Sequence, residues 1–368
     1  MTSPPSKLHS IQAARGIAAL LVVMHHISLR FEQRVAETNF LGVFDRFGFA
    51  GVDLFFVISG LIMVVTCHRH FGCGAAMLPF LWRRATRIYP LYWIFTVAQL
   101  SIILMIPSVT DRIITAGNIA ASFLLLPQSV YPILAPGWTL VYEMFFYLVF
   151  SLLFFIPKRF SIHLLVTWGL VTVGLYLLQT TDGLSDTTDL LQLPLYASPM
   201  TLEFLAGCLI GYLYIHQINR FAAISLAIGT VWFLGGWVLV EALTDASTEF
   251  GLTRVIVFGT GSTLILYGLV SLRQNAFNRW AVAIGDASYS LYLSHLLVIG
   301  AFAMVWSRLH LQGIAIQALF EVVMLATCVG FSIFTYRIVE APMLNQMRRK
   351  ERTDESTLVA LQTTTAET

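Results

Sequence analysis

Long, continuous runs of apolar residues make up most of the chain, and short polar stretches separate one run from the next. A helix needs about 20 mostly apolar residues to cross a bilayer, whereas strands with one buried face alternate apolar and polar positions. The runs therefore predict an all-α polytopic membrane helix bundle. We expect ten membrane spans, at residues 11–30, 49–66, 88–107, 138–156, 163–179, 196–215, 221–242, 254–271, 289–309 and 314–336.

Three further segments complete the predicted organisation. The apolar stretch Ile113 to Leu126 is too short to span, so we expect a re-entrant or an interfacial helix there. Residues 8–345 are expected to form one transmembrane domain, between a short tail at 1–7 and a polar, disordered tail at 346–368. The first span contains two histidines and no convincing cleavage site, so we expect it to be retained.

Composition and the placement of charge support a membrane protein. Apolar residues make up 57% of the chain and charged residues 11%, a balance too apolar for a soluble domain of this size. If the N-terminus is cytoplasmic, sixteen of the 22 Lys and Arg residues fall on the cytoplasmic side, as the positive-inside rule requires. Both termini are therefore expected in the cytoplasm. Four scattered cysteines indicate no disulfide framework, and we expect no nucleic-acid partner.

Ionisable residues at membrane depth are costly, which makes each of them a candidate for function. Arg15 and His26 are eleven positions apart in the first span, so they share one helix face and lie about 16 Å apart along the axis. His25 lies about 80° from that face. The alternative is an arginine that reaches the headgroups and a histidine at the opposite interface.

Asp53 and Glu143 are acidic residues in the second and fourth spans, at a depth similar to that of His26. A histidine beside a carboxylate is a common general base, because the acid orients the ring and stabilises its charged form. We therefore predict a catalytic group of His26 with Asp53 and Glu143. The alternative is that both acids form structural ion pairs with neighbouring helices.

Arg84 and Arg87 lie at i and i+3 at the inner end of the third span. Two guanidinium groups on one face can bind phosphates, although such residues also serve simply as membrane anchors. Ser288, Tyr292 and His295 share a face of the ninth span and are expected to line the same cavity, unless His295 is a packing residue. The spacing in CHRHFGC (67–73) is not a standard zinc pattern, so no metal site is expected.

Taken in order, these segments resemble the acyltransferase-3 family of integral membrane acyltransferases, and especially its exopolysaccharide and O-antigen O-acetyltransferase branch. The resemblance covers about residues 8–345. The segments that carry it are RGIAALLVVMHH with Arg15 and His26, GVDLFFVISGLIM, RRATRIYPLYW with Arg84 and Arg87, GWTLVYEMFFY with Glu143, SYSLYLSH, and EAP near the end. Many members have two adjacent glutamates in the fourth segment, and here Met144 takes the second position.

The resemblance implies transfer of an acyl group, usually acetyl, from cytoplasmic acyl-CoA to a hydroxyl of a cell-surface or lipid-linked glycan. Acetyl-CoA would be a co-substrate and no bound cofactor is expected; the setting would be the bacterial inner membrane, and lipopolysaccharide is one candidate acceptor. His26, Glu143 and Asp53 would be catalytic, Arg15, Arg84 and Arg87 would bind acyl-CoA, and Trp138 would line the cavity. A transient acyl-histidine is an alternative chemistry, and a glycan transporter or flippase is the alternative function.

Overall fold

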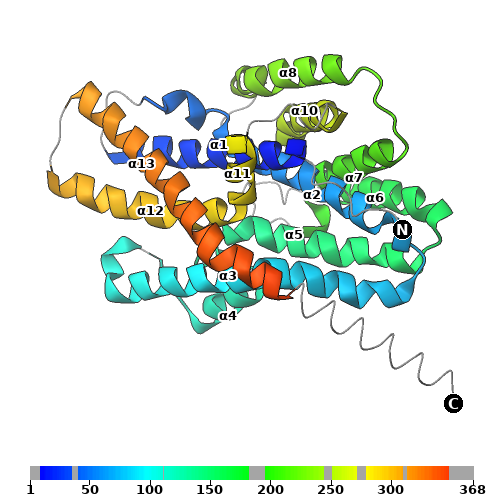
Figure 1. Cartoon of the computed structure of the whole chain (residues 1–368), viewed down its shortest axis with the longest axis horizontal. Helices are drawn as coiled ribbons and strands as arrows, with labels where there is room; N and C mark the ends of the chain where they lie inside the picture. The colour runs from blue at the N-terminus through cyan, green and yellow to red at the C-terminus, as the bar shows by residue number, and fades with distance from the viewer. Residues whose placement is uncertain are drawn as a thin grey trace.

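The computed structural model describes residues 9–34, 40–110, 112–181, 195–243, 251–271, 279–309 and 313–347. The predicted tail at 1–7 lies outside these residues, as does the predicted tail at 346–368 apart from residues 346–347, which are helical. The described residues form helices and connecting turns, with no strand among them, which confirms the all-α prediction. Figure 1 shows most of the long helices running along the longest axis, with α8 and α10 at one edge, α3 and α4 at the opposite edge, and α13 crossing obliquely.

The longer elements are separated by short helical turns, several of them 3₁₀ or π in character. Their bounds are α1 His9–Arg34, α2 Gly51–Cys67, α3 Met77–Met105, α4 Ala116–Leu124, α5 Gly137–Phe150, α6 Ser161–Thr181, α7 Thr201–Ile215, α8 Ala222–Leu243, α9 Leu252–Arg254, α10 Thr260–Ser271, α11 Arg279–Asp286, α12 Ser288–Leu309 and α13 Ile314–Thr335. The main turns are η1 Gly42–Asp45, η2 Gly48–Ala50, η5 Pro107–Val109, η6 Ser151–Phe155, η9 Leu195–Ala197, η10 Val255–Gly259 and η12 Tyr336–Glu340.

Nine helical stretches among the described residues are long and apolar enough to cross a membrane. They match nine of the ten predicted spans. The remaining predicted span, 196–215, contains a shorter helix, α7, of 15 residues. Pro199 lies between η9 and α7, and because proline lacks an N–H and disfavours helix before it, the chain turns there instead of continuing one helix.

The short helix α7 packs directly against α2 through glycines on both helices. A Cβ atom on Gly60 would collide with the backbone carbonyl of Phe204, and one on Gly207 would collide with that of Val57. Only residues without a side chain allow two helix backbones to come this close. This contact fixes α2 in the interior, and α2 is the most buried of the nine membrane-spanning stretches.

The predicted non-spanning segment at 113–126 forms the nine-residue helix α4, and its C-terminal end lies against α3. The carbonyl oxygens of its last residues accept hydrogen bonds from the side chains of Tyr89, Tyr92 and Trp93, at 2.8–2.9 Å. These donors lie near the middle of α3, so the end of α4 lies beside the middle of that helix, at the edge of the bundle. This placement favours the re-entrant alternative, since side chains satisfy the backbone groups that water would otherwise reach.

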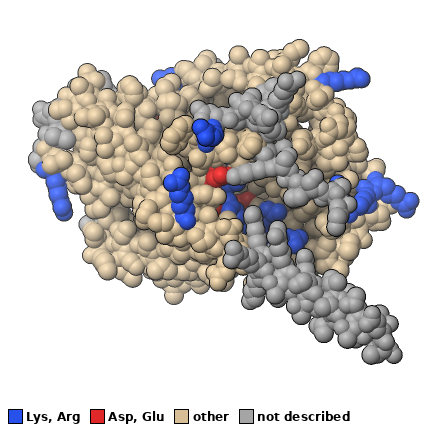
Figure 2. Space-filling view, viewed as in Figure 1, with Lys and Arg blue, Asp and Glu red and all other residues tan. Residues whose placement is uncertain are grey.

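The exposed side chains of the described residues are largely apolar, as expected for a protein in a lipid bilayer. Figure 2 shows that most of one face is neither acidic nor basic, and that Lys and Arg side chains on this face lie mainly in its central and right-hand parts. Large apolar side chains are also exposed along α6, α8 and α13. A multi-pass membrane protein exposes such residues to lipid, so the fold places its polar side chains inward or near the helix ends.

Candidate active site

A cavity of about 510 Å³ contains all three of the arginines predicted to bind acyl-CoA. We call it the arginine cavity. It lies between α1, α2, α3, α5, α12 and the segment at 336–345, which begins with η12, and its size is that of an ordinary small-molecule pocket. Its polar lining residues are Gln12, Arg15, Ser59, Thr66, Arg84, Arg87, Thr139, Glu143, Tyr147, Asp286, Ser288, Tyr289, Tyr292, Tyr336 and Asn345.

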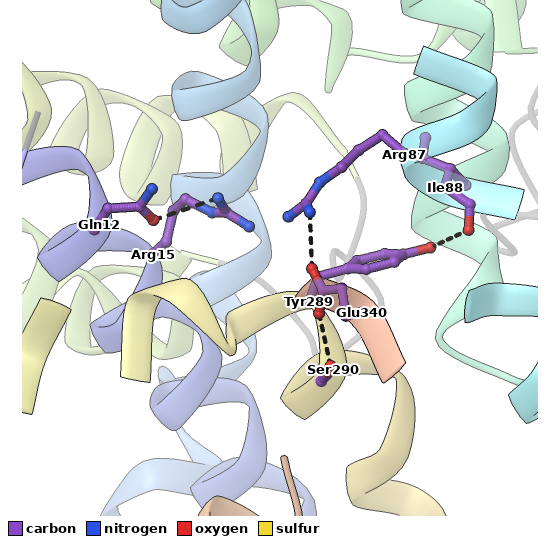
Figure 3. A network of polar contacts seen from close by, with 7 residues as sticks. All are labelled: Gln12, Arg15, Arg87, Ile88, Tyr289, Ser290 and Glu340. Carbon is purple, nitrogen blue, oxygen red and sulfur yellow. Dashed lines mark hydrogen bonds and ion pairs between the residues drawn. The ribbon is translucent and has the colours of Figure 1, made fainter. Parts of the chain in front are cut away.

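Arg87 is held in the arginine cavity by Glu340 of η12. Arg87 Nη1 lies 2.8 Å from Glu340 Oε1, and Ser290 Oγ donates to the other carboxylate oxygen at 2.6 Å (Figure 3). Glu340 is 3% exposed, whereas the Arg87 side chain is 30% exposed. Because the guanidinium has five N–H donors and this carboxylate takes one, Arg87 is oriented and still able to bind an anion.

Arg15 and Arg84 add two further positive charges to the same cavity. Arg15 Nη1 donates to Gln12 Oε1 at 3.4 Å, and in Figure 3 its guanidinium points toward that of Arg87. Arg84 lies over the ring of Tyr147, 5.7 Å from its centroid, and its buried Nε has no hydrogen-bond partner. Three guanidinium groups around one space form a strong binding site for phosphate or carboxylate groups.

Glu143 also lies in the arginine cavity, where it accepts hydrogen bonds from two hydroxyl groups. Ser59 Oγ donates to Glu143 Oε1 at 2.8 Å, and the Tyr147 hydroxyl donates to the same oxygen. Tyr147 follows Glu143 by four residues, so helical spacing could have identified this partner from the sequence. The prediction that Glu143 lies beside His26 is therefore not what the structure shows.

A second cavity, of about 950 Å³, contains His26, and we call it the histidine cavity. It lies between α1, the end of α3, α4 and the second half of α12. His26 Nδ1 lies 2.8 Å from the carbonyl oxygen of Val22. Because a carbonyl only accepts hydrogen bonds, Nδ1 must carry the proton, and Nε2 is left as the basic nitrogen. The cavity also has polar side chains, namely Arg30, Gln99, Thr110, Arg112, Asn118 and Tyr131.

His25 faces another part of the protein, as the helical spacing predicts. Its Nδ1 lies 3.4 Å from Asp45 Oδ1 and 3.2 Å from the Asp45 carbonyl oxygen. His26, and not His25, is among the lining residues of the histidine cavity. The difference of one position in α1 therefore separates a histidine bound to η1 from one that faces a large cavity.

Asp53 has a different partner from the predicted one. Its carboxylate accepts three hydrogen bonds from Arg254, at 2.6–3.2 Å, and both side chains are almost fully buried. Such a pair closes α2 against α9 and leaves the carboxylate turned toward a guanidinium instead of an imidazole. The prediction grouped Asp53 with His26 because both lie at similar depth, but depth along a helix does not determine the direction in which a side chain points.

Some of the remaining residues that were predicted to line the cavity do so, and others do not. Ser288 and Tyr292 line the arginine cavity, as expected. Trp138 lines neither of the two described cavities, because α5 turns the neighbouring Thr139 and the later Glu143 toward the arginine cavity, and Trp138 lies about 100° away from Thr139. Its ring instead packs edge-on against Tyr142, with centroids 5.9 Å apart.

His295 lies between the two cavities, behind Tyr292. Its ring centroid is 5.0 Å from that of His26 and 5.9 Å from that of Tyr292. His295 lines neither cavity, so the expectation that it shares a cavity with Ser288 and Tyr292 is wrong, and the alternative of a buried packing residue is nearer to what the structure shows. The sequence contained no sign of its contact with His26. Arg254 and Glu340 were missed as partners in the same way, because each contacts a residue more than 200 positions away.

Comparisons with known proteins agree with this architecture. Residues 8–337 match the model of the acyltransferase-3 family, which is described as "Acyltransferase domain". The chain is also similar to "Exopolysaccharide production protein ExoZ" of Rhizobium meliloti (strain 1021), with 32% identity in an alignment of 322 residues that covers 83% of this chain and 92% of that protein. No solved structure matches the chain.

Proposed function

This chain belongs to the acyltransferase-3 family of membrane acyltransferases, and from that premise we propose that it is an O-acetyltransferase of an exopolysaccharide. In the proposed reaction, acetyl-CoA enters from the cytoplasmic side of a bacterial inner membrane. The acceptor is a hydroxyl group of the polymer or of its lipid-linked precursor, on the other side. The name of the Rhizobium meliloti relative supports the exopolysaccharide, since it is described as a production protein for such a glycan.

The observation that carries this proposal is the arrangement of two cavities along α1. Arg15 lines one of them and His26 lines the other, and the residues are about 16 Å apart along the helix at 1.5 Å per residue. An enzyme that takes its donor from one side of a membrane and its acceptor from the other requires two such entrances. His295 and Tyr292 lie between them, so the reacting groups would meet near these rings.

The arginine cavity suits the donor because coenzyme A carries a pyrophosphate and a 3′-phosphate. Arg84 and Arg87 would bind these phosphates, with Arg15 as a third cation. Glu340 holds Arg87 in place while most of its N–H groups stay available. The pantetheine arm would then extend past Thr139 and Tyr292 toward the histidine cavity.

The basic nitrogen of His26 supplies the chemistry on the acceptor side. His26 Nε2 would remove the proton from the acceptor hydroxyl while the hydroxyl oxygen attacks the thioester carbonyl. The new C–O bond replaces the C–S bond, and coenzyme A leaves as the thiol once its sulfur has received a proton. The Val22 carbonyl accepts the Nδ1 proton, so it keeps the ring in the tautomer that this step requires.

Replacement of His26 tests the proposal directly. His26→Ala should reduce acetylation of the glycan about 100-fold or more, the usual effect of removing a general base. His25→Ala is the matched control, because His25 is the preceding residue and faces Asp45 instead of the cavity. The measurement is mass spectrometry of the surface glycan from cells that contain equal amounts of each folded variant.

Each outcome of this experiment has a clear reading. A glycan of normal length that lacks the acetyl mass increment in cells without the protein supports the acyltransferase. Loss of the whole glycan would instead support a transporter or flippase. Wild-type acetylation in His26→Ala, or a more severe defect in His25→Ala, would contradict the assignment of His26 as the base.

A further inference from the structure

His295 has an unusual position for a buried polar residue. It lies on α12 with 0% exposure, and its ring contacts the rings of two residues that line different cavities. Tyr292 belongs to the arginine cavity and His26 to the histidine cavity. His295 is therefore part of the wall that separates the proposed donor side from the proposed acceptor side.

The two nitrogens of His295 have different surroundings. Nδ1 lies 3.2 Å from the carbonyl oxygen of Leu291, so Nδ1 carries the proton and Nε2 is an acceptor. That Nε2 atom is buried and has no hydrogen-bond partner in the part of the chain that the structure describes. An unsatisfied buried acceptor destabilises a fold, and an apolar side chain would pack there without this cost. The nitrogen is thus available to receive a proton that the resting protein does not supply.

Among the residues that the structure describes, no carboxylate is hydrogen-bonded to His26, although one often accompanies a histidine base. Three acids that are candidates for this role contact other residues: Asp45 contacts His25, Asp53 contacts Arg254, and Glu143 accepts from Ser59. The ring of His26 contacts two other imidazoles: that of His25, at 5.1 Å, and that of His295, at 5.0 Å and an interplanar angle of 64°. His25 is itself bound to Asp45, whereas His295 lies toward the arginine cavity. A second neutral imidazole can accept a proton from a charged one, as a carboxylate can.

The proposed reaction also moves one proton from the acceptor hydroxyl to the departing sulfur of coenzyme A. Both atoms are bonded to the same carbon in the tetrahedral intermediate, which the pantetheine arm reaches past Tyr292. His26 takes the proton on the side of the histidine cavity, and the ring of His295 contacts the rings of both His26 and Tyr292. No proton is gained or lost overall, so a group that lies beside both can pass it from the first atom to the second.

We propose that His295 is the proton relay between His26 and the leaving sulfur of coenzyme A, an inference that rests on the proposed acetyl transfer. The proton passes from the acceptor hydroxyl to His26 Nε2, then to His295 Nε2, and then to the thiolate. The O–H and C–S bonds break, the C–O and S–H bonds form, and both imidazoles return to their neutral forms. Their Nδ1 protons stay on the backbone carbonyls of Val22 and Leu291 throughout.

The test compares variants at His295 with a control variant at the preceding residue, Ser294. His295→Gln keeps most of the side-chain volume but cannot carry a proton. Ser294→Ala is the control, because Ser294 is also buried with an unpartnered hydroxyl. The assay uses purified full-length protein with acetyl-CoA and the acceptor glycan. We expect His295→Gln to lower kcat about 100-fold with little change in the KM for acetyl-CoA. Ser294→Ala should retain nearly the wild-type kcat.

Chemical rescue distinguishes a relay from a packing role. His295→Ala should regain part of its activity in the presence of imidazole, because the free base can occupy the vacated space and carry the proton. Pyrazole has the same size and is a much weaker base, so it should not restore activity. A relay therefore predicts rescue by imidazole alone.

Two results would overturn the inference. One is a kcat of His295→Gln close to that of Ser294→Ala, and the other is an equal effect of the two rings on His295→Ala, including no effect of either. If the alanine variant does not accumulate, the glutamine variant decides alone. Failure of the wild-type protein to transfer acetyl from acetyl-CoA would instead contradict the proposed function itself.

Discussion

Two arginine–carboxylate pairs join distant parts of this chain, and their surroundings differ. Arg254 and Asp53 are 4% and 0% exposed, with three hydrogen bonds between them. Arg87 and Glu340 share one bond, and the arginine side chain is 30% exposed to a cavity. The first guanidinium is enclosed by its partner and the surrounding helices, whereas the second has N–H groups directed to a space that a ligand can enter.

An ionisable residue at membrane depth is therefore not by itself a functional site. Both Asp53 and Arg87 meet that description, and the sequence made both of them candidates. Access to a cavity separates the two. We therefore expect changes in the enclosed pair to affect folding and changes in the cavity pair to affect the binding of acyl-CoA.

The largest effect is expected at the enclosed pair. Arg254→Ala would leave the Asp53 carboxylate buried without a counter-charge, which costs about 3–5 kcal/mol in soluble proteins. We predict a large loss of folded protein, measured as monodisperse protein on size-exclusion chromatography in detergent and as the temperature of unfolding. The double variant Asp53→Leu with Arg254→Met should recover much of the yield, because apolar replacements of a buried pair are often tolerated.

The outcome at Arg254 can contradict the comparison. If Arg254→Ala folded with the stability of the wild type and lost only activity, the pair would belong to the reaction. The original expectation that Asp53 is catalytic would then be restored.

An intermediate effect is expected at Arg87. Arg87→Ala should raise the KM for acetyl-CoA about 10-fold or more, since a charge-assisted hydrogen bond contributes about 1.5–3 kcal/mol. Glu340→Gln should have a smaller effect on KM, because it weakens the orientation of Arg87 but leaves its charge. Steady-state kinetics with varied acetyl-CoA measure both. An unchanged KM in Arg87→Ala would make this arginine a membrane anchor only.

The smallest effect is expected at Arg84, whose guanidinium lies over the rings of Phe80 and Tyr147. Arg84→Lys keeps the charge but loses the planar fork and most of the stacking, so we predict a rise of about two- to fivefold in the same KM. Arg83→Lys is the matched control, because Arg83 is the preceding residue and is exposed. Equal effects of the two substitutions would show that position in the cavity has no importance here.

Helical periodicity predicted the parts of the site that depend on one helix. Arg15 and His26 line cavities along the same helix α1, and His25 faces elsewhere, as their spacing requires. Ser288 and Tyr292 were placed correctly for the same reason. Apolar run length predicted nine long helices of the described residues, and its tenth predicted span is interrupted at Pro199, where one residue overrides the hydropathy of the whole run.

Contacts between helices were not predictable in this way. Depth along a span placed Asp53, Glu143 and His26 at one level, but each is oriented by a different neighbour. The direction of a side chain follows from how each helix is rotated in the bundle, and that rotation depends on packing such as the close approach of Gly60 and Gly207. A sequence pattern within one helix contains no information about it.

In the proposed reaction, the donor enters at the arginine cavity on one side of the membrane and the acceptor is modified on the other. Sealed membrane vesicles of known orientation test it, with labelled acetyl-CoA added outside. Our account predicts that inside-out vesicles, which expose the cytoplasmic face, transfer label to glycan in their lumen, whereas right-side-out vesicles do so only after permeabilisation. Labelling of glycan by intact right-side-out vesicles would contradict the account.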